Sequence, residues 1–186
     1  MSKASYIVNH DILLKKLEHY GIRGLALDWF KSYLSNRKQF TQIQNINSNL
    51  HELTTGVPQG SVLGPLLFLI YVNDIANAVK NIDGNIMLFA DDTNVFVIGK
   101  DIYQLKKDTE VIIYELCIWF KTNKLTLNLD KTNYSIFHPP RKKIPHNCNT
   151  LTIGETILNR VDNVRYLGVY LEDMLNWKTQ IGRSRF

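Results

Sequence analysis

Two adjacent aspartates, Asp91 and Asp92, lie between two short apolar runs, and this arrangement constrains the fold of the chain more than any other feature. The runs, 86–90 and 93–98, have the length and the β-branched or aromatic content of strands. Adjacent carboxylates repel each other and weaken strand pairing by roughly a few tenths of a kcal/mol. A bound Mg²⁺ or Mn²⁺ ion, which prefers oxygen ligands, would offset that repulsion. The pattern predicts a hairpin with metal-binding carboxylates at its tip; a turn that uses Asp only for its conformation is the alternative.

A second segment, 55–65, contains three glycines and two prolines, which indicates a loop. Pro65 can open a helix, because the first turn of a helix needs no backbone N–H from that residue. Residues 66–72 are apolar on every side, so we expect this helix to lie inside the fold. The apolar run 62–72 is shorter than the roughly 20 residues of a membrane span, and no membrane association is implied.

These two segments resemble the reverse transcriptase domain of non-LTR (LINE-type, jockey-like) retrotransposons. The resemblance is carried by residues 56–61 and 89–93, which match the family in order and spacing. Further stretches match in the same order: 8–17, 29–37, 127–132 and 166–169. The resemblance implies an RNA-directed DNA polymerase that copies retrotransposon RNA by two-metal nucleotidyl transfer.

The implied fold is an α+β polymerase palm, an antiparallel sheet with helices packed on one face. We expect it to be truncated, lacking fingers and most of the thumb. Residues 1–186 would form a partial reverse transcriptase domain, with a palm over 1–160 and a primer-grip hairpin and the start of the thumb connection over 161–186.

Hydrophobic periodicity predicts helices before and after the glycine–proline segment and short strands near the end of the chain. The expected helices cover 11–20, 25–34 and 102–123, and the expected strands cover 134–137, 151–153, 155–158 and 164–171. Trp29, Phe30 and Tyr33 are expected on the inner face of the second helix.

The resemblance also assigns roles to charged residues. Asp91 would be a metal ligand, and Asp92 would be a second carboxylate of the site, although neighbours on a strand point to opposite faces. Lys131 would face the triphosphate and offer charge and a proton to the departing pyrophosphate; a solvated surface lysine is the alternative. Two Mg²⁺ (or Mn²⁺) ions, an RNA template, a DNA primer and deoxynucleoside triphosphates are implied for the intact family enzyme.

Five residues are expected to line the nucleotide and template pocket: Pro58, Gln59, Gly60, Ser61 and Ser5. A glycine there lets the backbone approach a base or sugar closely. Ser5 occupies the position where the family has an aromatic residue under the nucleotide sugar, which would leave the pocket wider. For Gln59 and Gly60, an ordinary loop is the alternative.

Three residues, Tyr166, Leu167 and Gly168, resemble the primer-grip hairpin and would hold the primer end. The alternative for Tyr166 and Leu167 is that they are core residues of a strand.

Members of the family open this domain with an Asp-x-x-x-Ala-Phe-Asp strand whose first Asp supplies a shared metal ligand. In this sequence that Asp would lie just before Met1, and Tyr6 stands at the second Asp. A site without one bridging carboxylate binds Mg²⁺ less well, because Mg²⁺ gives up its hydration reluctantly. We therefore expect the isolated chain to be inactive; a noncatalytic nucleic-acid-binding remnant and a decayed pseudogene product are the alternatives.

The net charge of +5 lies mostly in the second half of the chain, where 13 Lys or Arg face 9 Asp or Glu after residue 100. Such an excess suits contact with phosphates but is too small to establish it, and the basic stretch 141–143 is equally consistent with a solvated loop. Cys117 and Cys148 have neither disulfide-framework nor zinc spacing. With no apolar signal segment at the start, we expect an intracellular protein of the cytoplasm or nucleus.

Overall fold

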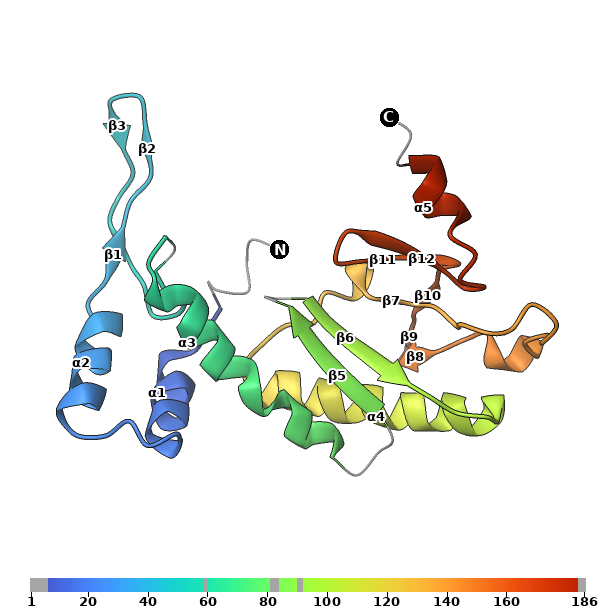
Figure 1. Cartoon of the computed structure of the whole chain (residues 1–186). Coiled ribbons are helices and arrows are strands. Elements are labelled where there is room, and N and C mark those ends of the chain that lie inside the picture. Colours follow the sequence, from blue (N-terminus) through green and yellow to red (C-terminus); the bar gives the residue numbers. More distant parts are fainter. Residues whose placement is uncertain (1–6, 59, 81–83, 90–91, 184–186) are drawn as a thin grey trace. The chain divides into compact units, whose positions relative to one another are not determined.

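The computed structural model describes residues 7–58, 60–80, 84–89 and 92–183. The chain forms two compact units. The first contains residues 1–96 and 115–126, and the second contains residues 97–114 and 127–186. Figure 1 shows the elements of both units; each unit is described separately.

The first unit begins with two helices, α1 (His10–His19) and α2 (Leu25–Leu34). Asn9 caps α1, since its side-chain oxygen accepts a hydrogen bond from the backbone N–H of Ile12 at 3.1 Å. Leu13 and Leu17, four residues apart, are fully buried, and α1 packs on both α2 and α3 (Leu63–Val72). The helices predicted over 11–20 and 25–34 are therefore confirmed.

The inner face of α2 differs from the sequence-based expectation. Leu27 and Leu34 are the buried residues of this helix, whereas the Trp29 side chain is 52% exposed. The placement of Trp29 on the inner face was wrong. The cause is that α2 carries apolar residues on two faces, and periodicity does not show which of them is covered.

The helix after the glycine–proline segment, α3, is only partly buried. Leu67, Phe68, Tyr71 and Val72 lie in the core, but Leu66 is 51% exposed, so the prediction of a fully internal helix was wrong. A 3₁₀ helix, η2 (Asn73–Val79), continues it and buries its own apolar residues at 75 and 79.

Between α2 and α3 the chain forms a long two-stranded ribbon that the sequence did not predict. Its base pairs β1 (Lys38–Gln39) with β4 (His51–Glu52), and its end pairs β2 (Gln42–Ile43) with β3 (Ile46–Asn47). Figure 1 shows the ribbon extending beyond α2. All strand residues of the ribbon are exposed.

Strands β5 (Gly84–Phe89) and β6 (Asp92–Val97) pair with each other and form the predicted hairpin around the aspartates. Their paired arrows run in opposite directions in Figure 1. Asp91 itself lies outside the described residues, as do Ser5 and Gln59.

The long helix α4 (Ile102–Thr122) matches the prediction closely. It belongs to the second unit up to residue 114 and to the first unit from residue 115. Its apolar stripe is buried at Ile112, Leu116 and Trp119.

The second unit contains short elements after α4. They are η3 (Leu129–Lys131), β7 (Asn133–Tyr134), η4 (His146–Cys148), β8 (Thr152–Ile153), β9 (Thr156–Ile157) and β10 (Asn159–Arg160). Strands β8 and β9 pair antiparallel, and β10 pairs parallel with β7. The region therefore has strands near the predicted positions, but they are shorter than expected.

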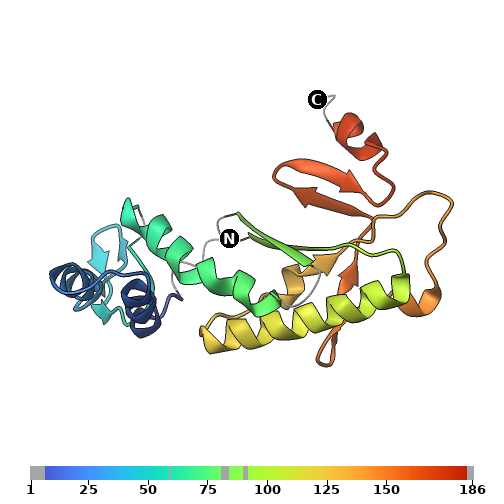
Figure 2. The ribbon, with the colours of Figure 1, turned by 60° about the horizontal axis from the view of Figure 1, so that its bottom comes forward.

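The second unit ends with a hairpin of β11 (Asn163–Tyr166) and β12 (Val169–Glu172), followed by α5 (Lys178–Arg183). Figure 2 shows α5 beside this hairpin, and β12 contacts α5. Glu172 is buried and accepts hydrogen bonds from the backbone N–H of Thr179, at 2.8 Å, and from its hydroxyl. The Thr179 hydroxyl thereby lowers the pKa of Glu172, and the carboxylate ties α5 to the hairpin.

Together the described residues form a mixture of helices and small two-stranded sheets. No helix among them has both the length and the apolar composition needed to cross a membrane.

Candidate active site

The entrance of the glycine–proline loop is held by the residues that precede α1. The N–H of Gly56 donates to the carbonyl of Val8 at 2.7 Å, and Asn9 forms an antiparallel bridge with Thr55. The carbonyl of Gly56 lies 2.7 Å from Nε2 of His10. Because a carbonyl only accepts hydrogen bonds, this nitrogen carries the proton and donates it. Both backbone polar groups of Gly56 are therefore satisfied by residues 8 and 10.

A glycine is favoured at this entrance, because Gly56 has a φ of 84°, in the left-handed region that other residues adopt only with strain. Val57 beside it is buried. Gly60 also has a positive φ, of 74°, and is exposed. The loop thus combines an anchored entrance with an open stretch of backbone.

The exit of the loop is fixed by Ser61. Its hydroxyl donates to the carbonyl of Pro58 at 2.7 Å and accepts from the N–H of Gly64 at 3.0 Å. A Cβ at position 64 would lie 2.6 Å from the Pro58 carbonyl oxygen, so only glycine fits there. Ser61 therefore holds the start of α3 against the loop, and Pro58 and Gly60 lie between the two anchors.

Sequence reasoning placed Pro58, Gly60 and Ser61 in the loop but missed two residues that shape it. His10 was noted only as part of a matching stretch, and Gly64 only as one glycine among three. A signal for Gly64 was available in its position directly before Pro65 and close to Ser61, where the turn into the helix is tightest.

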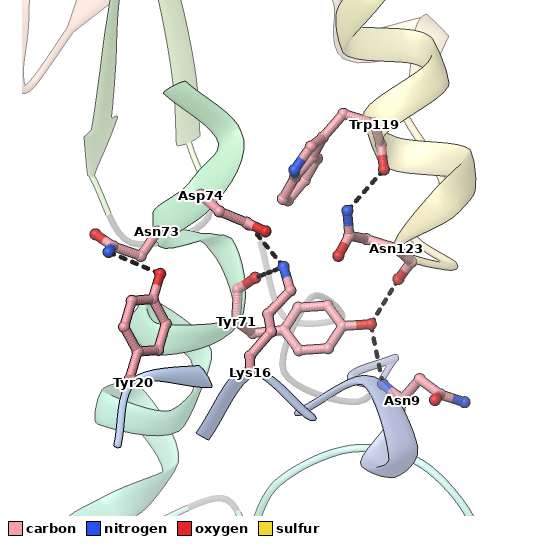
Figure 3. A network of polar contacts seen from close by, with 8 residues as sticks. All are labelled: Asn9, Lys16, Tyr20, Tyr71, Asn73, Asp74, Trp119 and Asn123. Carbon is pink, nitrogen blue, oxygen red and sulfur yellow. Dashed lines mark hydrogen bonds and ion pairs between the residues drawn. The ribbon is translucent and has the colours of Figure 1, made fainter. Parts of the chain in front are cut away.

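A buried polar network lies within the same unit and is centred on Lys16 (Figure 3). Its ammonium group donates to Oδ1 of Asp74 and to the backbone carbonyl of Tyr71, both at 2.6 Å. It also lies 5.0 Å from the ring centroids of Tyr71 and Trp119. Only 13% of the Lys16 side chain is exposed. Burial lowers the pKa of Lys16, and the carboxylate of Asp74 opposes that shift.

Tyr71 extends this network to the residues that hold the loop. Its hydroxyl donates to the carbonyl of Asn123, at 2.5 Å, and lies 3.4 Å from the N–H of Asn9. The Asn123 side chain in turn donates to the carbonyl of Trp119 at 2.9 Å. Burial raises the pKa of Tyr71, which keeps the phenol protonated as a donor. The network therefore connects α1, α3 and the end of α4 behind the loop entrance.

Asp92 is the part of the predicted carboxylate pair that the structure describes. It is the first residue of β6 and is exposed. Within the described ranges, no three His, Cys, Asp or Glu side chains are grouped so that they could hold a metal ion. The hard carboxylate donor of Asp92 suits Mg²⁺ or Mn²⁺ chemically; the proposed metal role of the pair stays a prediction.

Lys131 lies in the second unit, at the end of η3. The Asn128 side chain caps this turn by accepting from the N–H of Lys131 at 3.3 Å, and the Thr132 hydroxyl donates to the Asn128 carbonyl at 2.8 Å. The Lys131 side chain is exposed. The local structure thus presents a solvent-accessible lysine on an ordered turn, and its role toward a triphosphate stays a prediction.

The predicted primer-grip residues form the turn of the β11–β12 hairpin. Tyr166 pairs with Val169, and Leu167 and Gly168 have φ values of 47° and 89°. Two consecutive left-handed residues in a two-residue turn match the right-handed twist of the flanking strands. Glycine adopts this conformation without strain, whereas the side chain of Leu167 makes it less favourable. Leu167 is 54% exposed, so it lies in the turn and not in a strand core.

The family is identified by comparison with known proteins. Residues 1–171 match the family described as reverse transcriptase (RNA-dependent DNA polymerase). The chain belongs to this reverse transcriptase family, and the resemblance drawn from the sequence motifs is confirmed.

Individual relatives agree with this assignment. The chain is 29% identical over 153 residues to the probable RNA-directed DNA polymerase from transposon X-element of Drosophila melanogaster, covering 81% of this chain and 16% of that protein. It is 28% identical over 188 residues to the probable RNA-directed DNA polymerase from transposon BS of Drosophila melanogaster, covering 95% of this chain and 20% of that protein. It is 24% identical over 156 residues to the RNA-directed DNA polymerase from mobile element jockey of Drosophila melanogaster, covering 81% of this chain and 17% of that protein. The chain thus spans a fifth or less of the length of these relatives.

Proposed function

We propose that this chain is part of the palm of a retrotransposon RNA-directed DNA polymerase, which copies RNA by two-metal nucleotidyl transfer. The family match over residues 1–171 is the observation that supports this proposal most strongly. The names of the matched relatives, which are RNA-directed DNA polymerases of mobile elements, point to the same activity.

In the proposed reaction, the primer 3′-hydroxyl attacks the α-phosphorus of a deoxynucleoside triphosphate and loses its proton. The bond from that phosphorus to the bridging oxygen breaks, and pyrophosphate leaves. Asp91 and Asp92 would hold two Mg²⁺ or Mn²⁺ ions, which polarise the phosphate and stabilise charge on the attacking and leaving oxygens. Lys131 would neutralise the departing pyrophosphate and give it a proton.

The glycine–proline loop would bind the nucleotide and the template base. The anchors at Gly56 and Ser61 support this role, because a fixed loop positions a bound base without further loss of chain entropy. Gly60 leaves its backbone accessible there. Tyr166, Leu167 and Gly168 would hold the primer end at their hairpin turn.

We further propose that the 186-residue chain, tested by itself, binds metal and nucleotide weakly and does not extend a primer. Its residues include the Asp91–Asp92 pair but none that aligns with the first Asp of the family motif. One carboxylate fewer lowers the negative charge that draws Mg²⁺ out of water.

The test uses the purified chain with Mn²⁺, dTTP and an oligo(dT) primer on poly(A) RNA. Bound Mn²⁺ is measured by the loss of its free EPR signal, and Asp91→Asn is expected to weaken binding by about tenfold. Asp162→Asn is the matched control, because Asp162 is exposed and lies in the second unit. Equal Mn²⁺ binding by the chain and by Asp91→Asn would overturn the proposed metal site.

Primer extension is measured in the same mixtures. Extension by the chain above an Asp91→Ala control would show that the 186 residues are active by themselves and would overturn the proposed inactivity. Nucleic-acid binding that is strong, salt-dependent and unaffected by Asp91→Asn or Mn²⁺ would instead favour a noncatalytic binding role.

A further inference from the structure

Helix α2 carries a cluster of three aromatic side chains, of which Trp29 is 52% exposed and Phe30 and Tyr33 are half-buried. Trp29 and Tyr33 stack with ring centroids 5.3 Å apart and planes 12° apart. Phe30 meets the edge of Trp29 with centroids 5.1 Å apart. Leu25, one turn before Trp29, is 89% exposed. We call Trp29, Phe30 and Tyr33 the aromatic platform.

The ribbon formed by β1 to β4 follows this platform directly in the chain. Gln39 pairs with His51, and Gln42 pairs with Asn47. Between these two pairs the returning strand therefore contains one residue more than the outgoing strand. The extra residue is a bulge, which bends and twists a ribbon. Two-stranded ribbons are marginally stable by themselves in water, and this one exposes Phe40 at its base and Ile43 at its end.

Helix α2 and the ribbon together carry a small basic excess. Residues 29–51 contain no Asp or Glu, although the first hundred residues as a whole are nearly balanced, with 9 Lys or Arg against 8 Asp or Glu. Lys31 pairs with Asp28 at 3.1 Å, and Glu52 lies opposite Lys38 in the ribbon. Arg37 and Lys38 therefore supply the small basic excess of this surface. Amide side chains occupy much of the rest: Asn36, Gln39, Gln42, Gln44, Asn45, Asn47 and Asn49.

The exposed Trp29 ring, the basic side chains and the many amides of this surface are complementary to a single nucleic-acid strand. Aromatic faces stack on unpaired bases, and Arg or Lys side chains neutralise phosphates. Amides donate and accept hydrogen bonds along base edges and sugars. Stacking on the platform needs bases that are free of a duplex. The charge and the rings together favour an unpaired strand over a duplex.

We propose that the aromatic platform and the ribbon bind a single nucleic-acid strand. The return strand of the ribbon runs through residues 53 and 54 into Thr55, at the entrance of the glycine–proline loop. A strand bound here would therefore lead toward that loop. Its identity as the unpaired part of the RNA template rests on the proposed polymerase function; the binding surface itself does not.

The test measures the affinity of the full 186-residue chain for a fluorescent single-stranded RNA of about 12 nucleotides at several salt concentrations. In the double variant Arg37→Gln/Lys38→Gln, the slope of log K against log salt is expected to fall by about 1.4, because two phosphate contacts are lost. The matched control is Arg141→Gln/Lys143→Gln, which removes the same charge from the exposed loop at 141–143. Lys142 is left in place, because its ammonium donates to the carbonyl of Lys100.

The aromatic contribution is tested with Trp29→Ala, which is expected to weaken RNA binding by about tenfold, and with Trp29→Phe, which keeps a ring and most of the affinity. Circular dichroism confirms that each variant is folded. Equal salt slopes for the two double variants, or unchanged affinity in Trp29→Ala, would overturn the proposed surface. Equally strong binding of a blunt duplex would do the same.

Two further outcomes separate this inference from the polymerase proposal. A concentration-dependent dimer that Trp29→Ala abolishes without weakening RNA binding would assign the platform to a protein contact and overturn the inference. RNA binding that depends on Arg37, Lys38 and Trp29 would support the proposed nucleic-acid surface, whatever the result for the metal site. Mn²⁺ binding that did not depend on Asp91 would count against the proposed polymerase site alone.

Discussion

Two regions of the first unit depart from the usual distribution of residues in opposite directions. The network around Lys16 buries a lysine, a residue type that is rarely buried unless it is paired. The aromatic platform on α2 exposes Trp29, a large ring of a type that is usually mostly covered. The buried lysine has a carboxylate, a carbonyl and two rings around it, whereas the platform has its own neighbouring rings as partners.

This difference in burial indicates that the Lys16 network serves the stability of the fold, whereas the aromatic platform is available for binding. A satisfied buried network holds elements together, and its removal is expected to affect folding before it affects ligands. The platform contributes little to folding because Trp29 is half exposed. The unfavourable exposure of this ring to water is best explained by a ligand that covers it. Both regions contain a Trp and a Tyr, and Lys31 lies on α2 beside the platform. Each of these residue types gives a matched pair of substitutions that tests this distinction.

The largest contrast is expected between the two tryptophans. Trp119→Ala removes a ring that is 9% exposed and lies over the Lys16 ammonium, and it is expected to lower the free energy of unfolding by about 3 to 5 kcal/mol. Trp29→Ala removes a ring that is half exposed and is expected to cost about 1 kcal/mol or less. Urea unfolding followed by circular dichroism measures both. Equal losses would show that the platform is part of the folding core.

The two lysines give the next contrast. Lys16→Met leaves Asp74 without its ion-pair partner and is expected to lower the free energy of unfolding by about 1 to 3 kcal/mol. This loss is smaller than that for a fully buried ion pair, because the Asp74 side chain is 34% exposed. Lys31→Met breaks the exposed pair with Asp28, for which the expected loss is under about 1 kcal/mol.

The same urea titrations at low and high salt sharpen this pair. Salt screens exposed charges more than buried ones, so 1 M NaCl is expected to erase the effect of Lys31→Met and to leave most of that of Lys16→Met. A Lys16→Met loss that disappears in salt would mean that the ammonium is solvated.

The tyrosines give a smaller contrast and a dependence on pH. Tyr71→Phe removes the donor to the Asn123 carbonyl and is expected to cost about 1 kcal/mol at pH 8, while Tyr33→Phe in the platform serves as the control. Burial is the main cause that raises the pKa of Tyr71. The stability that this phenol contributes is therefore present below its ordinary pKa of about 10 and is lost as pH rises through the higher pKa of the folded state.

The free energies of unfolding of the wild type and of Tyr71→Phe, measured at pH 8 and above pH 10, test this direction of the pH dependence. The difference between the two proteins is expected to shrink at the higher pH. A difference that grows with pH would contradict a protonated Tyr71 as the donor. Lys16 titrates in both proteins, so its own contribution largely cancels in the comparison.

The contrast also explains which features the sequence could predict. The helices around Leu13, Leu17 and Ile112 were predicted because apolar residues recur at helical spacing and local patterns determine them. The exposed face of α2 was misassigned, because Trp29 and Leu27 are both apolar and only the packing of α1 shows which side is covered.

The ribbon was missed for a different physical reason. Residues 38–52 have no buried face, so they lack the apolar–polar alternation that marks a strand and fixes its register, although the paired residues are close in the chain. In the candidate site, the motifs located the glycine–proline loop and the primer-grip turn. They did not reveal that His10 and Gly64 fix the ends of that loop, because those contacts join separate segments or depend on the space beside Pro58.

The smallest effect is expected at the end of the ribbon. Gln44 has a φ of 54°, a conformation that glycine adopts without the strain of a side chain. Gln44→Gly is expected to stabilise the ribbon by about 0.5 kcal/mol, the strain relieved exceeding the added entropy of the unfolded chain. Because the ribbon is exposed and opens locally, hydrogen exchange at the N–H of Ser48, which donates to Thr41 at 2.9 Å, is the suitable measurement.

That exchange rate is expected to fall about twofold in Gln44→Gly, whereas Gln42→Gly, a strand position in the same ribbon, is expected to raise it. The RNA affinity of Gln44→Gly then tests the proposed surface in a second way. A ribbon that is ordered in advance loses less entropy when it binds a strand, so affinity is expected to rise by the same small factor. If the RNA affinity of Gln44→Gly fell instead, binding would require the ribbon to open. The binding surface would then form only when RNA binds and would not exist in the free protein.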